Sequence, residues 1–574
     1  MKHLKESKFR SIIAHNYPQI SVSKKDDCLL LEGTVDSLDI INEIGYLAAR
    51  VHSGGVINKI ALKDYQEPAM KISPIKDSLY EGLRPEVLVI GGGVVGCAIL
   101  RELSKYHVDA VLLEKENDVA LHASSHNDGC IHVGADLSRH SKKYHYLRRA
   151  VPVYETLAKD LGFDYVKTGQ TVVFENKAER LLGPLLRIMF ARKGNPDMQI
   201  WSAKKVKAVA PGITDSAKFA LHFPRGAVVS PYHVTIAFAE NAIENGAKVL
   251  LETAVLGMTV KDHVIERVQT NRGTIYPKIV INAAGVFSDK VADMAEDQFF
   301  TIHPREGLDV IFDKKIQKRL TNTTISLYES KKSRGKAHTK GGGLVPTTDG
   351  NLLAGPTARE TIYRENFETD RDSFDSVLEK HRRTLPGVTY GDVITYFSGI
   401  RAATYEEDFV IQPGKWTRNI VHAAGIQSPG LTAAPAIAED VVHMVSTLLE
   451  KPLVRKTDFR SVREVAKPLC DMSFEERDAR IKANPDYGHI ICRCEEISRG
   501  EIIDALHRPL PVLTVDGIKR RVRPGMGRCQ GGFCQPLVLQ IMASEMKLDL
   551  ESIAKKGTGK ILLGNSKGEA HGNV

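Results

Sequence analysis

EVLVIGGGVVGCAILRELSKYHVDAVLLEKE (residues 86–116) places an apolar strand, a glycine turn, a helix and a second apolar strand in order. Gly91, Gly93 and Gly96 form a G-x-G-x-x-G turn, and Glu114 ends the second strand. Such glycines permit the tight turn, the approach of a pyrophosphate and close helix packing, while the acid accepts ribose hydroxyls. The helix N-terminus also offers free N–H groups to phosphates. We therefore predict a dinucleotide site; the alternative is an ordinary βα turn.

Two later segments favour a flavin over a nicotinamide. KIVINAAGVFSD (278–289) is an apolar strand that ends in small residues and Gly285, and NIVHAAGIQSPGLTAAPAIAEDVV (419–442) is a strand, a glycine loop and a new helix. Glycines let such a loop lie against a flat ring, and a helix N-terminus can donate N–H groups to a flavin carbonyl. In the second segment, the residues predicted to contact the ring are Gly425, Gly430 and Leu431.

Together these segments resemble the glycine-oxidase and D-amino-acid-oxidase superfamily of FAD enzymes over residues 85–445. The resemblance implies an α/β fold, in which a Rossmann-like FAD-binding domain is interleaved with an α+β substrate domain. It also implies FAD as the cofactor.

ASSHNDGCIHVGADL (123–137) resembles the flavin-contact loop of 2-hydroxyglutarate dehydrogenases and of the large subunit of anaerobic glycerol-3-phosphate dehydrogenases. Segments 343–358 and 397–402 also match this branch. Asp136 and Leu137 stand where many relatives have aromatic residues, which leaves the pocket shape and the substrate open. The resemblance implies that the flavin is lined by Ser124, Ser125, Asn127, Gly129, His132 and Gly134.

Three residues are candidates for substrate binding and catalysis. A flavin accepts a hydride from a carbon that bears OH or NH₂. The protein must therefore bind the anionic end of the substrate, orient this carbon and remove the proton from the heteroatom. Arg401 in SGIRA is the first anion clamp, because relatives place this arginine beside the flavin and its fork fits a carboxylate or phosphate. Arg305 in HPREGLDV is the second, and His132 is the candidate base or alcohol-orienting group.

Each of these assignments has a plainer alternative. Arg401 can serve as a structural ion pair, Arg305 as a surface residue and His132 as a histidine that packs on the flavin. The basic run 331–340 can steer an anion to the site, but we favour a solvated loop.

Four of the eight cysteines lie in two short segments near the C-terminus, ICRCEEIS (491–498) and GMGRCQGGFCQP (525–536). Four thiolates at closed spacing suit an iron–sulfur cluster or zinc. Zinc ribbons favour C-x2-C pairs, whereas C-x-C followed by a glycine-rich C-x4-C resembles the bacterioferritin-associated-ferredoxin-like fold. That resemblance implies a 2Fe-2S cluster, with zinc as the alternative. The implied ligands are Cys492, Cys494, Cys529 and Cys534.

Composition excludes several classes of protein. The 574 residues are 42% hydrophobic and 26% charged, which excludes wholesale disorder. The net charge of +9 comes from dispersed residues, so we expect a small anionic substrate or an acidic protein partner and no nucleic acid. No apolar run reaches the roughly 18–20 residues that span a bilayer, and the first twenty residues hold no signal-peptide core. We predict a cytoplasmic protein, with at most peripheral contact at the inner face of the membrane.

The predicted domain order starts with a small α/β unit at residues 1–66, which resembles the BON domain; an unrelated α/β appendage is the alternative. The segments predicted after it are a Pro-containing linker at 67–84, the oxidoreductase body at 85–450, a connecting segment at 451–485, the 2Fe-2S domain at 486–550 and a tail at 551–574.

A flavin oxidase needs no cluster because oxygen can reoxidise the flavin, so a cluster on the same chain implies electron transfer to a partner. We therefore predict an FAD-dependent dehydrogenase that oxidises a small anionic hydroxy substrate, in the first place sn-glycerol 3-phosphate. Electrons would pass from FAD through 2Fe-2S to an accepting protein. One alternative is an L-2-hydroxyglutarate, other 2-hydroxy acid or amino acid dehydrogenase; another is an electron-transfer subunit that oxidises nothing itself.

Overall fold

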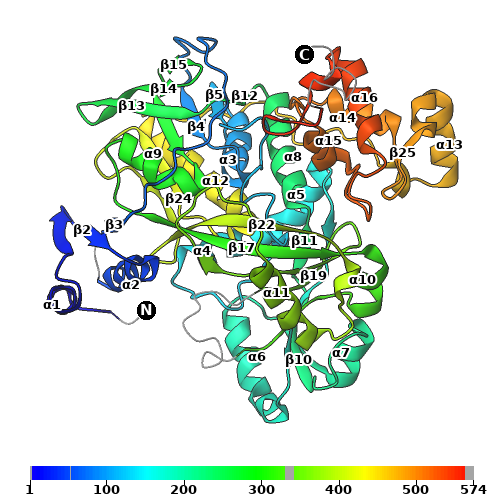
Figure 1. Ribbon diagram of the computed structural model, residues 1–574, viewed down its shortest axis with the longest axis horizontal. Helices are drawn as coiled ribbons and strands as arrows, with labels where there is room; N and C mark the ends of the chain where they lie inside the picture. Colours follow the sequence, from blue (N-terminus) through cyan, green and yellow to red (C-terminus); the bar gives the residue numbers. More distant parts are fainter. Residues whose placement is uncertain (1–2, 52–53, 330–341, 563–574) are drawn as a thin grey trace, which may run out of the picture.

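The computed structural model describes residues 3–51, 54–329 and 342–562. The basic run 331–340, predicted to be a solvated loop, and the tail beyond residue 562 lie outside the described residues. In Figure 1 an N-terminal unit (residues 3–62, blue) and a cysteine unit (residues 474–560, orange to red) lie on opposite sides of a central body.

The N-terminal unit is a three-stranded sheet with two helices, in the order β1-β2-β3. Three strands and two helices make it up: α1 (Glu6–Asn16), β1 (Ser21–Lys25), β2 (Cys28–Val35), α2 (Leu38–Ala48) and β3 (Val56–Leu62). The described part of residues 1–66 is thus a small α/β unit, as the sequence predicts. Tyr405 of the body completes the unit's apolar core. A Cβ on Gly45 of α2 would lie 2.4 Å from the Tyr405 ring, so this glycine allows the close approach.

A six-stranded sheet forms the first part of the body, with its strands parallel except for the last. The order is β12 (Lys248–Leu250), β5 (Ala110–Leu113), β4 (Val87–Ile90), β16 (Ile279–Asn282), β24 (Ile420–Ala424) and β23 (Val410–Pro413). Its strands are apolar on both sides, as buried parallel strands are.

Helices cover one face of this sheet and a small antiparallel sheet covers the other. The helices are α3 (Val94–Ser104), α4 (Lys142–Ala150), α5 (Tyr154–Leu161), α8 (Pro231–Glu244) and α12 (Gly430–Leu448). The opposite face holds β13 (Val255–Lys261), β14 (Val264–Thr270), β15 (Gly273–Ile275) and α9 (Ser288–Met294).

The second part of the body is a nine-stranded sheet, to which the chain returns between visits to the parallel sheet. Its strands are β21 (Arg359–Glu360), β17 (Ile302–Phe312), β20 (Leu352–Gly355), β19 (Gly343–Pro346), β18 (Thr324–Leu327), β8 (Gln170–Phe174), β10 (Phe219–Phe223) and β9 (Gln199–Ser202), with β22 (Val393–Thr404) on β17. Helices α6 (Gly183–Arg192), α7 (Ala203–Val209), α10 (Lys314–Leu320) and α11 (Arg371–Thr384) flank it. The interleaved α/β architecture predicted from the sequence is therefore confirmed.

A further small sheet lies between the two parts: β6 (Cys130–Ile131), β11 (Ala227–Val229) and β7 (Tyr165–Val166). Its strand β6 lies within the predicted flavin-contact loop. Residues 67–84, the predicted linker, contain no helix or strand. No helix in the described ranges is both long and apolar enough to cross a lipid bilayer.

The cysteine unit is helical around its own apolar core. Its elements are α13 (Phe474–Ala483), β25 (Ile490–Cys492), β26 (Ile497–Ser498), α14 (Arg499–Leu506), α15 (Val515–Val522), α16 (Gln535–Met546), β27 (Ala554–Lys556) and β28 (Gly559–Lys560). The unit docks on the body through charge: Arg520 and Arg521 of α15 both donate to Asp118, which follows β5, at 2.9 Å. All three side chains are buried.

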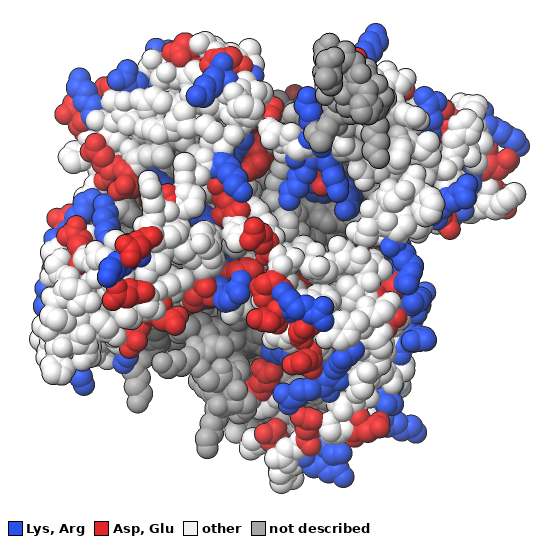
Figure 2. All heavy atoms as spheres, in the orientation of Figure 1, with Lys and Arg blue, Asp and Glu red and all other residues white. Residues whose placement is uncertain are grey.

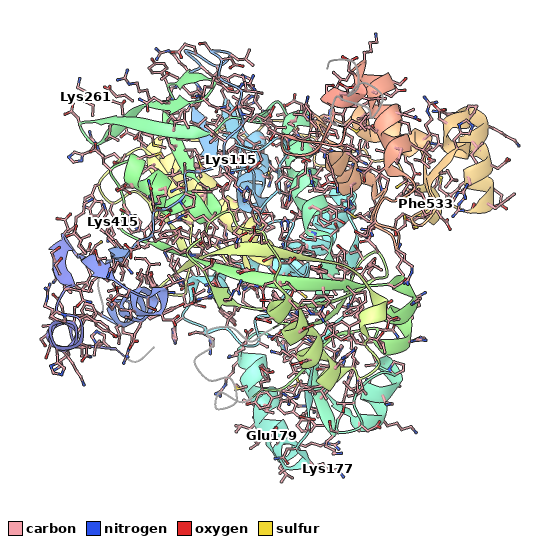
Figure 3. The ribbon with its side chains drawn as sticks, viewed as in Figure 1. Lys115, Lys177, Glu179, Lys261, Lys415 and Phe533 are labelled. Atoms are coloured by element: carbon pink, nitrogen blue, oxygen red, sulfur yellow. The ribbon has the colours of Figure 1, made fainter. Side chains whose placement is uncertain are left out.

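Charges elsewhere are mixed in sign. Figure 2 shows basic and acidic side chains interspersed over the visible face. Ion pairs also link the body to the N-terminal unit: Lys415 (Figure 3) donates to Asp27 at 2.8 Å, and Lys59 lies 3.7 Å from Asp293 of α9.

We expect Asp118→Ala to lower the free energy of unfolding by about 3–5 kcal/mol, because it leaves two buried guanidinium groups without their carboxylate. Thermal unfolding measures the change. Asp215→Ala is the matched control, since the Asp215 side chain is 100% exposed, and it should unfold like the unmodified protein. Equal losses in both variants would show that the Asp118 pair does not hold the cysteine unit.

Candidate active site and cluster site

The glycine turn has the geometry that a pyrophosphate site needs. Gly91 has a φ of +110°, which a residue with a side chain rarely adopts. Gly93 is the N-cap of α3. A Cβ on Gly96 would lie 1.9 Å from the Gly91 carbonyl oxygen, so the helix can pack against the turn only with glycine there.

Glu114 lies across this turn at the end of β5. Its carboxylate accepts the backbone N–H groups of Gly92 at 2.7 Å and Glu116 at 2.9 Å. Burial raises the pKa of the Glu114 carboxyl. Gly92, which the sequence analysis did not single out, also needs to be glycine because its Cβ would lie 2.9 Å from the Glu114 carboxylate. The acid therefore lies where a ribose would meet the turn.

The predicted flavin-contact loop closes over the start of α3. Ser124 accepts the backbone N–H of Val94, in the first turn of α3, at 2.8 Å. Asn127 fixes the loop's shape, since its amide donates to the carbonyls of Ala123 at 3.0 Å and Ser124 at 3.2 Å, while its oxygen accepts the N–H of Gly129 at 3.0 Å. Gly129, with a φ of +68°, approaches a neighbouring carbonyl too closely for a Cβ.

His126 is a loop residue that the sequence analysis missed. Burial lowers the pKa of its imidazole to about 4, so it is neutral at physiological pH. Its ring nitrogen Nδ1 lies 2.8 Å from the His122 carbonyl and 3.2 Å from the hydroxyl of Ser125. A Cβ on Gly399 of β22 would meet His126, so this histidine touches the nine-stranded sheet.

His132 joins the two parts of the body. Its backbone N–H donates to Thr432 of α12 at 3.1 Å. The ring nitrogens lie 3.4 Å from the Gln170 amide of β8 and 3.4 Å from the Ser428 hydroxyl of the glycine loop. Gly134 follows with a φ of +69°. The imidazole is thus held between a substrate-side strand and the flavin-side loop, and its role as base or orienting group stays a prediction.

Of the two glycine segments, the first provides room for a flat group. Gly285 has a φ of +56°, and no described atom lies within 4 Å of a Cβ built on it. Gly425 has a φ of +64°, and Gly430 begins α12, whose Leu431 carbonyl accepts the Tyr154 hydroxyl. A positive helix end, an acid and an open glycine wall therefore fit FAD.

Arg401 and Arg305 lie opposite each other on β22 and β17. One Arg401 donor, Nη2, reaches the Thr357 carbonyl at 3.0 Å, and the guanidinium forms no other hydrogen bond to a described residue. A Cβ on Gly307 would lie 2.0 Å from that nitrogen, so the group lies directly over Gly307. Burial lowers the Arg401 pKa. Arg401 therefore has donors left for an anion.

Arg305 differs, because the protein itself occupies its donors. It is only 1% exposed and donates to Glu360 at 2.9 Å, Glu407 at 2.5 Å, Gln427 at 3.1 Å and the Tyr46 hydroxyl at 2.6 Å. Tyr46 comes from α2 of the N-terminal unit. The surface role offered as an alternative is wrong, since the side chain is buried in this network. In this arrangement Arg305 supports the site, and direct anion binding by it stays a prediction.

The four cysteines come together. Cys494 Sγ lies 3.6 Å from Cys529 Sγ, and Cys492 and Cys534 are buried beside each other. Burial disfavours the Cys529 thiolate, but backbone N–H groups of residues 531–533 donate to its sulfur and lower its pKa overall. Thiolates that accept backbone N–H groups are what an iron–sulfur cluster requires.

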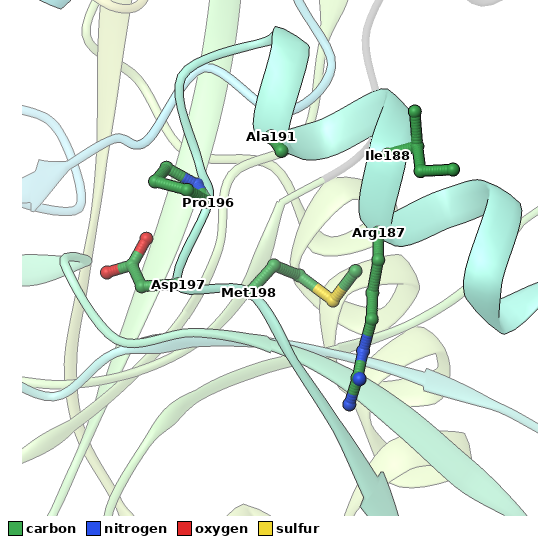
Figure 4. Close-up of a pocket in the computed structure, with 6 residues that line it drawn as sticks. All are labelled: Arg187, Ile188, Ala191, Pro196, Asp197 and Met198. Atoms are coloured by element: carbon green, nitrogen blue, oxygen red, sulfur yellow. The ribbon is translucent and has the colours of Figure 1, made fainter.

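A separate pocket of about 400 Å³ lies on the outer edge of the nine-stranded part, between α6 and the segment that follows it (Figure 4). None of the predicted site residues lines it. Its lining residues are Arg187, Ile188, Ala191, Pro196, Asp197 and Met198.

Family models agree with this geometry. The model of FAD dependent oxidoreductases matches residues 86–444, and the model of the BFD-like [2Fe-2S] binding domain matches residues 490–544. The chain belongs to the FAD dependent oxidoreductase family. It is an FAD-dependent enzyme whose C-terminal unit carries a 2Fe-2S cluster, as predicted from the sequence.

Relatives of known activity cover most of the chain. It is 36% identical over 486 residues to glycerol 3-phosphate dehydrogenase of Caloramator mitchellensis, which covers 84% of this chain and 99% of the relative. It is 26% identical over 425 residues to mitochondrial L-2-hydroxyglutarate dehydrogenase of Caenorhabditis briggsae, covering 63% and 93%. The solved structure of L-alpha-glycerophosphate oxidase from Mycoplasma pneumoniae, with FAD bound, matches with a TM-score of 0.61 at 27% identity, covering 67% and 99%. Subunits A of anaerobic glycerol-3-phosphate dehydrogenases also match, so the predicted resemblance to these dehydrogenases and to 2-hydroxyglutarate dehydrogenases is confirmed.

We expect Gly93→Val to give a folded protein that lacks FAD. Within 4 Å, a Cβ at this position meets only the Ser124 hydroxyl, at 3.2 Å, so the variant can fold but blocks the approach of a pyrophosphate. Flavin absorbance after reconstitution measures the loss. Gly96→Val should instead lower the melting temperature, because its Cβ meets the Gly91 carbonyl. Full flavin content in Gly93→Val would place the pyrophosphate elsewhere.

Proposed function

We propose that this enzyme is a dehydrogenase that oxidises sn-glycerol 3-phosphate and passes electrons from FAD through the 2Fe-2S cluster to a protein partner. The observation that carries the proposal is the match to a glycerol 3-phosphate dehydrogenase over 99% of that relative's length. A second support is Arg401, whose half-buried guanidinium keeps donors for an anion on the sheet face beside the flavin-contact loop. A planar fork of this kind suits a phosphate.

In this proposal each residue has a defined task. Bound FAD supplies the hydride acceptor. Arg401 holds the phosphate of the substrate and thereby places the carbinol carbon, because a fixed geometry is what converts binding into rate. His132, held between Gln170 and Ser428, orients the substrate hydroxyl and takes up its proton. Ser124 and Asn127 keep the loop closed over the helix N-terminus that binds the pyrophosphate.

The cluster site supports transfer to a partner. Cys494 is exposed, and Phe533, next to Cys534, is 83% exposed on the outer side of the cysteine unit (Figure 3). A partner can therefore approach the cluster ligands without rearrangement of the body. The identity of that acceptor, and a location in the cytoplasm or at the inner face of the membrane, stay predictions.

L-2-Hydroxyglutarate is the second candidate substrate, because a dehydrogenase of that compound matches 93% of its own length to this chain. A subunit that only transfers electrons is less well supported, since Arg401 and His132 both lie at the interface between the two parts of the body.

Anaerobic bleaching of the flavin tests the substrate. We expect glycerol 3-phosphate to bleach it faster than 2-hydroxyglutarate, lactate or amino acids. Arg401→Lys should lower kcat/KM at a cost of about 1.5–3 kcal/mol, because lysine keeps the charge and loses the fork. Arg383→Lys, an exposed arginine on α11, is the matched control. Preferential bleaching by 2-hydroxyglutarate would favour the second candidate, and an unchanged Arg401→Lys would remove Arg401 from the site.

Cys529→Ser tests the electron route, because a serine oxygen is a harder and poorer ligand for iron. We expect the variant to lose iron and sulfide, to be bleached normally by substrate, and to keep turnover with a small dye while turnover with a protein acceptor falls. Cys470→Ser, at an exposed cysteine outside the ligand set, is the control. Equal loss of both activities in a folded, FAD-loaded variant would mean that the cluster unit shapes the active site.

A further inference from the structure

Asp309 of β17 is a buried acid whose position has no structural explanation. Its side chain is 1% exposed, and neither carboxyl oxygen has a hydrogen-bond partner among the described residues. An unpartnered buried polar group of this kind costs free energy. Native interiors keep such groups at few positions, and a missing ligand is one reason for them.

The neighbours of Asp309 place it in the substrate site. Leu308 and Val310 enter the apolar core of the nine-stranded part, so Gly307 and Asp309 share the opposite face of β17. The Arg401 guanidinium lies over Gly307.

A short segment, residues 355–357, lies against both the Asp309 carboxyl and the Arg401 guanidinium. A Cβ on Gly355 would lie 2.5 Å from Asp309 Oδ1, and the Thr357 carbonyl accepts Arg401 Nη2 at 3.0 Å. The acid and the arginine therefore lie along one wall. Arg401 has unused donors and Asp309 has unused acceptors.

Charge around Asp309 comes from two elements. Burial raises the pKa of the Asp309 carboxyl well above its usual range; Asp128, in the flavin-contact loop, adds to the rise and Arg401 of β22 opposes it. The carboxyl therefore faces the flavin-contact loop as well as the arginine. A protonated carboxyl both donates and accepts, which matches a hydroxyl group.

We propose that Asp309 binds a hydroxyl group of the substrate and thereby selects polyol phosphates. This role rests on the proposed function. Arg401 binds the anionic end of the substrate, and Asp309 recognises the alcohol at the uncharged end. A second carboxylate, as in a hydroxy dicarboxylic acid, would instead meet the charge of Asp128 beside Asp309, and like charges at close range destabilise each other. Asp128, and not the protonated Asp309, therefore disfavours the second candidate substrate.

Two variants test the role in FAD-loaded protein. Asp309→Leu removes the polar group, and Asp309→Asn keeps its shape and hydrogen bonding. Binding of glycerol 3-phosphate and of inorganic phosphate is followed through the flavin spectrum. We expect Asp309→Leu to bind glycerol 3-phosphate roughly 10- to 100-fold more weakly than the unmodified protein. Asp309→Asn should lose less of this affinity. Inorganic phosphate should bind all three proteins within about twofold, since Arg401 is unchanged.

Thermal unfolding separates a binding role from a structural one. Neither Asp309 variant should melt below the unmodified protein, because each relieves the burial of an unpartnered acid. Asp297→Asn is the matched control: this acid is fully buried but accepts His422 at 2.8 Å and three backbone N–H groups. It should lower the melting temperature and leave the preference for glycerol 3-phosphate over phosphate unchanged.

The outcomes separate a failure of the proposed function from a failure of the proposed role of Asp309. If the unmodified protein neither binds nor oxidises glycerol 3-phosphate, the proposed function fails and the inference fails with it. If it oxidises glycerol 3-phosphate while both Asp309 variants bind it equally well, only the inference fails. A lower melting temperature in both variants, or an equal loss of phosphate binding, would also overturn it.

Discussion

The guanidinium of Arg305 is a full charge in the interior of the protein, and the arrangement around the active site follows from its neutralisation. A buried charge is tolerated only when paired and hydrogen-bonded. Its partners come from distant parts of the chain: Glu360 on β21, Glu407 after β22, and Gln427 in the glycine loop beside the flavin. Tyr46 completes the set from the N-terminal unit.

This network changes how the N-terminal unit is understood. The family models begin at residue 86, so the unit lies outside them. It nevertheless contributes a hydroxyl to the charge network behind the substrate sheet and receives Tyr405 into its own core. Gly45 is needed for that contact, because the Tyr405 ring leaves no room for a Cβ. The unit is therefore part of the support of the site rather than a module carried on a linker.

The sequence was informative where the signal is local. The glycine turn, the acid at the end of β5 and the cysteine spacing each lie within short stretches, and short-range patterns predict them well. Arg305 shows the limit of local patterns. The segment HPREGLDV suggested an anion clamp, because the partners that occupy Arg305, at positions 46, 360 and 407, are remote in sequence and could not be foreseen. Asp309 was missed in the same strand, although an acid between the apolar residues Leu308 and Val310 was a visible signal. His126 was missed because only the fold brings it against Gly399 of β22.

Three polar groups of β17 and β22, the buried Arg305 and Asp309 and the half-buried Arg401, show how support and recognition divide within one sheet. Arg305 has partners for its donors, so its contribution is fixed on folding and it holds neighbouring segments in register. Arg401 has one partner and Asp309 has none among the described residues. The protein provides hydrogen-bond partners for every part of Arg305 but leaves donors of Arg401 and both oxygens of Asp309 without described partners. A bound ligand would supply those partners. One unmet group is a cation and the other an acid, so the ligand that completes them carries an anion and a hydroxyl a few bonds apart.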